Sequence, residues 1–158
     1  MLGSFKERAR SYSCQTNLKG LGAGVAAYMT DHANAWPQIS APEPPSAEPP
    51  ASSSGSVSQS TAFATKWIEA LAPYGVAEKT WHCPSLDARI ASRSGASALQ
   101  TKRLDYVPTS FDPSPGGAYQ WPGHPWFIER SPIHGNGANL LLTNGRVVSM
   151  AELIKEIR

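Results

Sequence analysis

The chain has 158 residues, of which 14 are lysine or arginine and 12 are acidic, so its formal net charge is +2. This length fits one domain with a modest core. The near-neutral charge gives no sign of a nucleic-acid partner or a polybasic membrane patch. No apolar run of about 18 residues occurs, so we expect no transmembrane helix within this sequence.

The first segment has the apolar spacing of an α-helix, with apolar residues recurring at intervals of four and three. This packing stripe consists of Cys14, Leu18, Leu21, Val25 and Tyr28. Phe5, Ala9 and Tyr12 form a separate patch on the same helix. We expect the helix to end around residues 31–34, because Pro37 biases the residue before it away from helical torsion angles.

Three glycines interrupt this helix at Gly20, Gly22 and Gly24. Each glycine costs about 1 kcal/mol relative to alanine inside a helix. We interpret them as places where another backbone approaches closely. They are not a dinucleotide-binding fingerprint, since no strand precedes them.

Residues 37–60 are rich in proline and serine. Such a segment buries too little apolar surface to offset its ordering entropy, so we expect a flexible surface loop inside a single domain, 1–158. Thr61 is predicted to cap a second helix, which Pro73 ends. Its apolar positions are Phe63, Trp67, Ile68 and Leu71.

The next part of the chain reads as a short extended segment, 79–84, followed by a loop with some helix to residue 102. Strands are predicted over 104–111 and 126–129, because apolar and β-branched or aromatic residues are frequent there. A turn-rich loop, 113–125, separates the two.

Two apolar runs flank Asn144-Gly145, which predicts a hairpin with a two-residue type I′ turn, because both central residues must take positive φ. The expected cross-strand pairs are Leu142 with Val147 and Leu141 with Val148. Both faces of this hairpin are apolar, so we expect a cover on each side, the first helix being one of them. Residues 151–157 should form a short terminal helix. The element order is typical of an α+β fold.

The residue types that zinc prefers are sparse here. The candidate zinc ligands are His82, Cys83, His124 and His134. Adjacent side chains of an extended segment point to opposite faces, so His82 and Cys83 should not share one ion. None of the close Cys or His spacings of zinc sites occurs, and we predict no metal site and no cofactor.

Signatures of catalysis are also missing from the sequence. A hydrolase acting through His134 would lack the G-x-S-x-G motif and a local partner signature. Asp87, Asp105 and Asp112 are too scattered along the sequence to indicate calcium. We predict that the chain is not an enzyme, that His134 is a hydrogen-bonded structural histidine, and that Gly135 belongs to a strand-entry turn.

Cys14 and Cys83 are the only cysteines. They could pair in an oxidising compartment, or they could be two buried free thiols. A redox site is not indicated, because there is no C-x-x-C motif.

Taken together, these motifs resemble those of prepilin-type proteins, the superfamily of type IV pilins and type II secretion pseudopilins. The matching segments are 9–10, 14–19, 28, 37, 67, 71–74, 83–85, 134–139 and 144–147. One subgroup carries a histidine, nine residues and then Asp-Gly near the C-terminus. His134 and Asn144-Gly145 have this spacing, with Asn in place of Asp. Asn retains the turn chemistry but removes the charge.

The resemblance implies a pilin-like fold, in which a long N-terminal helix packs on a small antiparallel sheet with a C-terminal hairpin. It implies a structural, non-enzymatic subunit of a pilus-like or pseudopilus assembly, with other pilin or pseudopilin subunits as partners. An apolar helix of about 20 residues would precede this sequence, anchor the protein in the inner membrane and follow a leader cut by a prepilin peptidase. We expect that this helix was removed to give a soluble chain, the alternative being a naturally soluble paralogue.

The same resemblance places the globular part in the periplasm, and an extracytoplasmic setting favours a disulfide between Cys14 and Cys83. An alternative function is that of an envelope-tethered binding module. In that case the loop with Trp121 and Trp126 would hold a glycan or a secreted protein.

Overall fold

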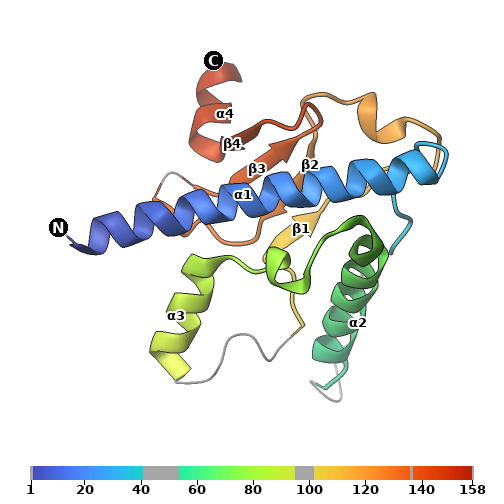
Figure 1. Ribbon diagram of the computed structural model, residues 1–158. Coiled ribbons are helices and arrows are strands. Elements are labelled where there is room, and N and C mark those ends of the chain that lie inside the picture. The colour runs from blue at the N-terminus through green and yellow to red at the C-terminus, as the bar shows by residue number, and fades with distance from the viewer. Residues whose placement is uncertain (1, 41–53, 95–101, 136, 158) are drawn as a thin grey trace, which may run out of the picture.

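The computed structural model describes residues 2–40, 54–94, 102–135 and 137–157. Its fold is α+β, as expected: the long helix α1 (Leu2–Asp31) lies across one face of an antiparallel sheet (Figure 1). The other helices are α2 (Ser54–Leu71), α3 (Pro84–Ser94) and α4 (Met150–Ile157), with short 3-10 turns at Ala72–Tyr74, Glu78–Trp81 and Gly117–Tyr119. The strands are β1 (Tyr106–Pro108), β2 (Pro125–Glu129), β3 (Asn139–Leu142) and β4 (Val147–Ser149).

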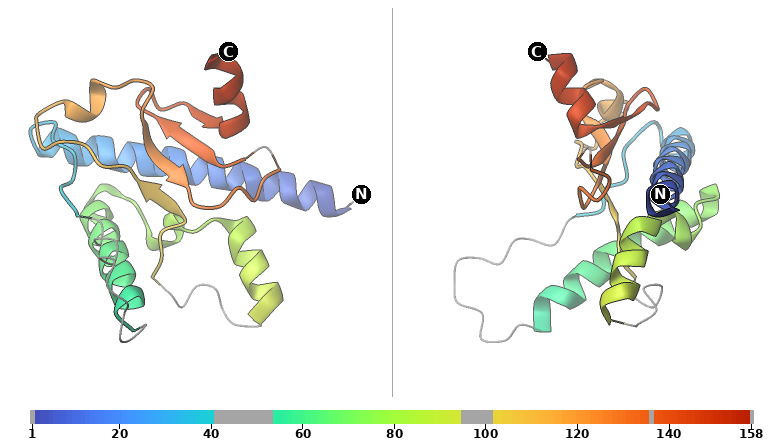
Figure 2. Two further views of the ribbon diagram at one scale, coloured as in Figure 1. Left: turned by 180° about the vertical axis from the view of Figure 1, so that it is seen from behind. Right: turned by 90° about the vertical axis from the view of Figure 1, so that its left-hand side faces the viewer.

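The sheet has the order β1-β2-β3-β4, and each neighbouring pair is antiparallel. Figure 2 shows α1 along one side of this sheet and α4 beyond its other side. Phe127 and Leu141 face the main core with α1, and Leu140 and Val148 face a smaller cluster that Leu153 of α4 covers. The expected cover on both faces of the hairpin is therefore confirmed.

The apolar stripe of α1 is confirmed over most of its length. Cys14, Leu18, Leu21 and Val25 have no exposed surface. The stripe then continues through Met29, which is fully buried, whereas the Tyr28 side chain is half-buried at the edge of the core. Within the part of the chain that the structure describes, no helix combines the length and the apolarity needed to cross a bilayer.

The helix ends where the sequence predicted. Ala33 and Asn34 take left-handed torsions with φ of 54° and 60°. The backbone N–H of Asn34 donates to the carbonyl of Met29 at 2.7 Å, which satisfies one carbonyl at the helix end.

Two glycines of α1 do accommodate close neighbours, but the nearest atoms belong to side chains, and the one backbone neighbour is the carbonyl oxygen of Tyr74, at 4.0 Å from a Cβ at Gly24. A Cβ at Gly22 would lie 2.6 Å from Cδ2 of Leu141, and a Cβ at Gly24 would overlap Cγ2 of Val76. The glycines therefore let the sheet and the turn after α2 pack directly on the helix. Gly20 has only an ordinary contact, with Thr80 at 3.5 Å.

The second helix starts earlier than the sequence predicted. It begins at Ser54, so Thr61 lies inside α2 and is not its N-cap. Serine is only moderately unfavourable in a helix, and no proline occurs between residues 51 and 72 to stop it. The buried anchors Trp67 and Leu71 hold its C-terminal end. The remaining part of the expected loop, 41–53, lies outside the described residues.

The segments around Pro84 also differ from expectation. Residues Glu78–Trp81 form a 3-10 turn and not an extended stretch, and Pro84 is the first residue of α3. Proline suits that position, because the first helical N–H has no partner within the helix. The strand expected over 104–111 is limited to Tyr106–Pro108, and the strand expected over 126–129 is confirmed as β2.

The hairpin is present, but its turn and register are not those predicted. Leu141 pairs with Val147 and Leu140 with Val148. The N–H of Leu142 donates to the carbonyl of Arg146, and the N–H of Gly145 donates to that of Leu142, each at 2.9 Å. Gly145 has a φ of 79°, but Asn144 does not take a positive φ. The loop therefore has three residues ending in a left-handed glycine, which shifts the pairing by one position.

Candidate metal centre

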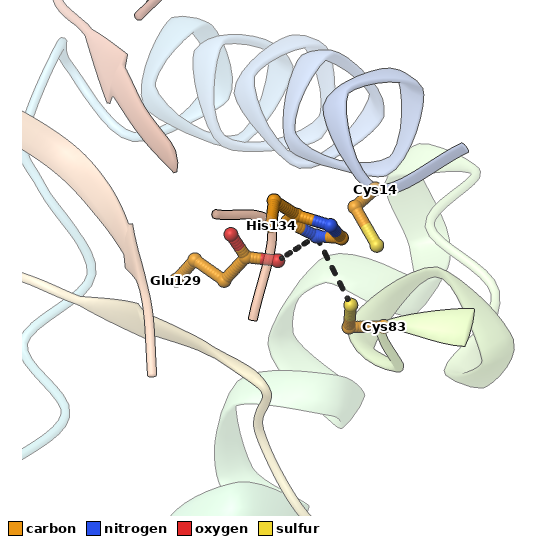
Figure 3. A group of neighbouring side chains, drawn as sticks. All are labelled: Cys14, Cys83, Glu129 and His134. Carbon is orange, nitrogen blue, oxygen red and sulfur yellow. Dashed lines mark hydrogen bonds and ion pairs between the residues drawn. The ribbon is translucent and has the colours of Figure 1, made fainter. Parts of the chain in front are cut away.

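Four side chains of metal-ligand type meet between α1 and the sheet: those of Cys14, Cys83, Glu129 and His134 (Figure 3). One ligand atom of each lies within 4.8 Å of the ligand atoms of the other three. Cys14, Cys83 and Glu129 are buried, and the His134 side chain is only 1% exposed. This group is called the Cys-His-Glu cluster below.

Each of the four comes from a different segment. Cys14 lies on the buried stripe of α1, and Cys83 directly precedes α3. Glu129 is the last residue of β2, opposite Tyr106 of β1, and His134 follows in the loop after β2. The glycine next to His134, Gly135, has a φ of 74°, so the expected left-handed turn is confirmed.

His134 has partners at both ring nitrogens. Its Nε2 lies 2.9 Å from Oε1 of Glu129 and 3.7 Å from Sγ of Cys83. Its Nδ1 lies 3.2 Å from Oε1 of Glu7, on the first part of α1. The histidine is hydrogen-bonded, as the sequence predicted, and it points with Nε2 into the cluster (Figure 3).

The surroundings fix the other members of the cluster. Oε2 of Glu129 accepts hydrogen bonds from the backbone N–H and the side-chain amide of Asn139, both at 3.0 Å. The backbone N–H of Cys83 donates to Oδ2 of the buried Asp105 at 2.7 Å. These bonds leave Oε1 of Glu129 and Sγ of Cys83 directed toward His134.

Proton affinities in the cluster are shifted by contacts between its members. The hydrogen bond between the two thiols lowers the pKa of Cys14, against the opposing effect of burial. That hydrogen bond, together with burial, raises the pKa of Cys83. Burial disfavours the charged ring of His134, but the Glu129 carboxylate and the Cys83 contact outweigh it and raise the pKa of His134.

The predicted disulfide residues lie together in this cluster. Cys14 and Cys83 are both present as buried free thiols, so the structure brings the sulfurs close without joining them. The disulfide stays a prediction. The other part of the C-terminal motif lies elsewhere: Asn144 is exposed in the hairpin turn, where its Oδ1 accepts the N–H of Arg146 at 2.9 Å.

Cys83 and His134 are zinc candidates from the sequence, but nothing in the sequence connects them with Cys14 or Glu129. No local spacing could have done so, because the four residues lie on segments that only the folded chain brings together. His82, by contrast, is not in the cluster, as the argument from adjacent side chains expected.

A second group of ligand-type residues consists of His82, Asp87 and Asp105. The positive charge at this group is the side chain of Arg103. The guanidinium of Arg103 forms ion pairs with both carboxylates, at 2.8 Å from Nε to Oδ1 of Asp105. Asp87 and Asp105 are far apart in the sequence, but the fold brings their carboxylates together. Arg103 takes the place that a metal ion would have between them. His124 lies apart from both groups, edge-on to Phe111.

Trp121 and Trp126 have different surroundings, because Trp121 lies in the loop before β2 and Trp126 is the second residue of β2. Trp121 is 61% exposed. Trp126 is buried, and its Nε1–H donates to the carbonyl of Ala118 at 3.1 Å. Only Trp121 could contact a ligand from solvent.

No protein-family model matches this chain, and neither a curated protein nor a solved structure was found to match it. The resemblance to prepilin-type proteins therefore remains a prediction from sequence motifs. The structure itself supports the coarser description, a long N-terminal helix on a four-stranded antiparallel sheet.

Proposed function

We propose that this protein is a structural, non-enzymatic subunit of a pilus-like or pseudopilus assembly. The observation that carries the proposal is the division of α1 into two parts. From Cys14 onward its apolar stripe is buried, whereas Phe5 is 76% and Tyr12 is 75% exposed. The N-terminal end of the helix also projects beyond the sheet (Figure 1).

Exposed aromatic side chains on a projecting helix favour contact with another protein, because burying them removes apolar surface from water. In the proposed assembly, this part of α1 in one subunit packs against α1, or against another face, of the neighbouring subunit. Such contacts are heterologous, and heterologous contacts that do not close into a ring build a helical filament. The compact part around the sheet would lie outside the helical core.

The resemblance adds the setting of the proposed assembly. A longer precursor would continue α1 toward its N-terminus as an apolar helix in the inner membrane, after a leader cut by a prepilin peptidase. The domain described here would then be on the periplasmic side of the cell envelope, with other pilin or pseudopilin subunits as partners.

A cross-linking experiment on the full gene in its own host tests the proposal. A photo-reactive amino acid at Tyr12 should give a ladder of covalent multimers, and N-terminal sequencing of detergent-extracted protein should show a processed leader. The matched control places the same amino acid at Lys155, which is exposed on α4. An unprocessed protein, extracted without detergent and giving no multimers at Tyr12, would contradict the proposal.

One observation favours the alternative, a binding module for a glycan or a secreted protein. Trp121 borders a hollow of about 250 Å³ that Phe111, Asp112 and His124 also line. An exposed indole beside polar groups can stack on a sugar ring. Binding of soluble oligosaccharides that is lost in Trp121→Ala would support the alternative, and no binding by the unaltered protein would remove it.

A further inference from the structure

We propose that the Cys-His-Glu cluster is a structural zinc site, with Sγ of Cys14, Sγ of Cys83, Nε2 of His134 and Oε1 of Glu129 as its four ligands. This inference is independent of the proposed assembly, since it concerns how the domain is held together. The ion would join α1 to the start of α3 and to the end of β2.

The chemistry of the ligand set favours zinc. Thiolate and imidazole ligands suit zinc, and structural zinc sites have four protein ligands and no open position. Two thiolates, one carboxylate and a divalent ion sum to a net charge of about −1, the same as in a Cys₃His zinc site. Magnesium and calcium prefer sites with oxygen ligands only, so two cysteines argue against them.

The distances are close to those of a tetrahedral site. Ordinary zinc–sulfur and zinc–nitrogen bond lengths place a sulfur and a nitrogen ligand about 3.6 Å apart, and Sγ of Cys83 lies 3.7 Å from Nε2 of His134. Nε2 and Oε1 of Glu129 are 2.9 Å apart, which is a hydrogen-bond distance. An ion between them requires a separation of about 3.4 Å, so this pair must open by about half an ångström.

The ligand atoms are also oriented as in metal sites. A histidine that binds zinc through one nitrogen donates its other N–H to a carboxylate or carbonyl, and ligating carboxylates are themselves hydrogen-bonded. Here Nδ1 of His134 faces Oε1 of Glu7, and Oε2 of Glu129 accepts both hydrogen bonds of Asn139. The atoms that would not bind the ion are thus already held by protein groups.

Zinc binding and disulfide formation exclude each other in this cluster. Zinc binding displaces the proton of each thiol to solvent, and the proton between Nε2 of His134 and Oε1 of Glu129 moves to Nδ1 of His134 or to solvent. No oxidation state changes. A disulfide would remove two protons and two electrons and would need an external oxidant. The disulfide would involve only the sulfurs of Cys14 and Cys83, and the buried side chains of His134 and Glu129 would take no part in it.

The test measures metal and thiols in the same purified full chain. After reduction, loading with zinc and dialysis, we expect about one zinc per chain. Cobalt(II) in place of zinc should give a thiolate-to-cobalt charge-transfer band and the visible bands of tetrahedral cobalt. Protein isolated without reductant should show two reactive thiols once denatured. No bound metal, or no reactive thiols because the cysteines are joined, would overturn the proposal.

Variants separate ligands from neighbours. His134→Ala and Cys83→Ser should retain less than about a tenth of the wild-type zinc, and Glu129→Gln should weaken zinc at least tenfold. The matched control is His124→Ala, which changes a histidine outside the cluster. Circular dichroism establishes that each variant is folded. Folded His134→Ala and Glu129→Gln proteins that bind zinc like the wild type would overturn the proposal.

Discussion

Glu7 and His134 are separated by 127 residues in the sequence, yet Oε1 of Glu7 lies 3.2 Å from Nδ1 of His134. The contact joins the first part of α1 to the loop after β2. Oε1 of Glu7 also accepts the hydroxyl of Ser85 at 2.8 Å, so this one carboxylate reaches both α3 and the sheet side of the cluster. The Glu7 side chain is 42% exposed, and its Oε2 also lies 3.8 Å from Nη1 of Arg10.

Glu7→Ala should weaken zinc binding by about 10- to 100-fold, because loss of the carboxylate leaves the ring of His134 less well oriented and less basic. The free energy of unfolding of the metal-free protein should also fall by about 1–3 kcal/mol, because the buried Ser85 hydroxyl and the His134 ring lose a hydrogen-bond partner. Competition with a chromophoric chelator measures the affinity. Glu69→Ala, an exposed change of the same kind on α2, is the control and should bind zinc like the wild type. Equal affinities for all three proteins would argue against this role of Glu7.

The glycines of α1 should respond differently to alanine. Gly24→Ala should lower the free energy of unfolding by about 1–3 kcal/mol, because its Cβ overlaps the buried side chain of Val76. Gly20→Ala should raise it by up to about 1 kcal/mol, because the added Cβ makes only an ordinary contact with Thr80 and alanine is the better helix former. Urea unfolding measures both. A more stable Gly24→Ala protein would contradict the close packing of Val76 against α1 at this position.

The hairpin turn can be tested at Asn144 and Gly145, the last two residues of its three-residue loop. Gly145→Ala should cost about 1–2 kcal/mol, because alanine is strained at a φ of 79°. Asn144→Asp should change stability by less than about 0.5 kcal/mol, because a carboxylate can still accept the N–H of Arg146. Chemical denaturation of both variants gives the comparison. A large loss in Asn144→Asp with none in Gly145→Ala would contradict the three-residue loop.

Ser149 and Glu152 form a capping box at the start of α4. The N–H of Glu152 donates to Oγ of Ser149 at 3.2 Å, and the N–H of Ser149 donates to Oε2 of Glu152 at 2.8 Å. Ser149→Ala should cost about 1 kcal/mol of stability. Ser13→Ala, an exposed change inside α1, should cost none, because alanine favours the helix. Urea unfolding measures the stability of both variants. An equal loss in both would indicate a general effect of removing serine, and not the loss of a helix cap.

The same cap predicts a pH dependence. The backbone hydrogen bond from Ser149, followed by its side-chain hydrogen bond, holds the pKa of Glu152 below its ordinary value of 4.5. A carboxyl group with a lowered pKa stabilises the fold above its unfolded pKa, and this contribution is lost as the pH falls through the folded value. The stability difference between wild type and Glu152→Gln should therefore shrink from pH 7 to pH 3. A difference that stays constant would exclude the effect.

The sequence predicted the elements whose signals are local. Leu18, Leu21 and Val25 recur at helical spacing, and the apolar runs on both sides of Asn144-Gly145 allow a hairpin and little else. The register of that hairpin could not be predicted, because it depends on whether one or both turn residues take left-handed torsions. Asn-Gly is compatible with a two-residue or a three-residue loop. The register with the three-residue loop is the one in which Leu141 packs against Gly22 of α1.

The cluster was beyond local reasoning for a different reason. Cys14, Cys83 and Glu129 belong to an amphipathic helix, a turn and a strand, and each is unremarkable in its own segment. Only the crossing of α1 over the end of β2 brings their side chains together, and the sequence contains no short motif that records this crossing. His134 was identified as a structural histidine, but its partners Glu7 and Glu129 were not.

X-ray diffraction from crystals of the zinc-loaded protein, recorded on both sides of the zinc absorption edge, tests the zinc site most directly. We expect one anomalous peak per chain, bonded to the sulfurs of Cys14 and Cys83 at about 2.3 Å and to His134 and Glu129 at about 2.0–2.2 Å. Continuous density between the two sulfurs, with no anomalous peak among the four side chains, would contradict it.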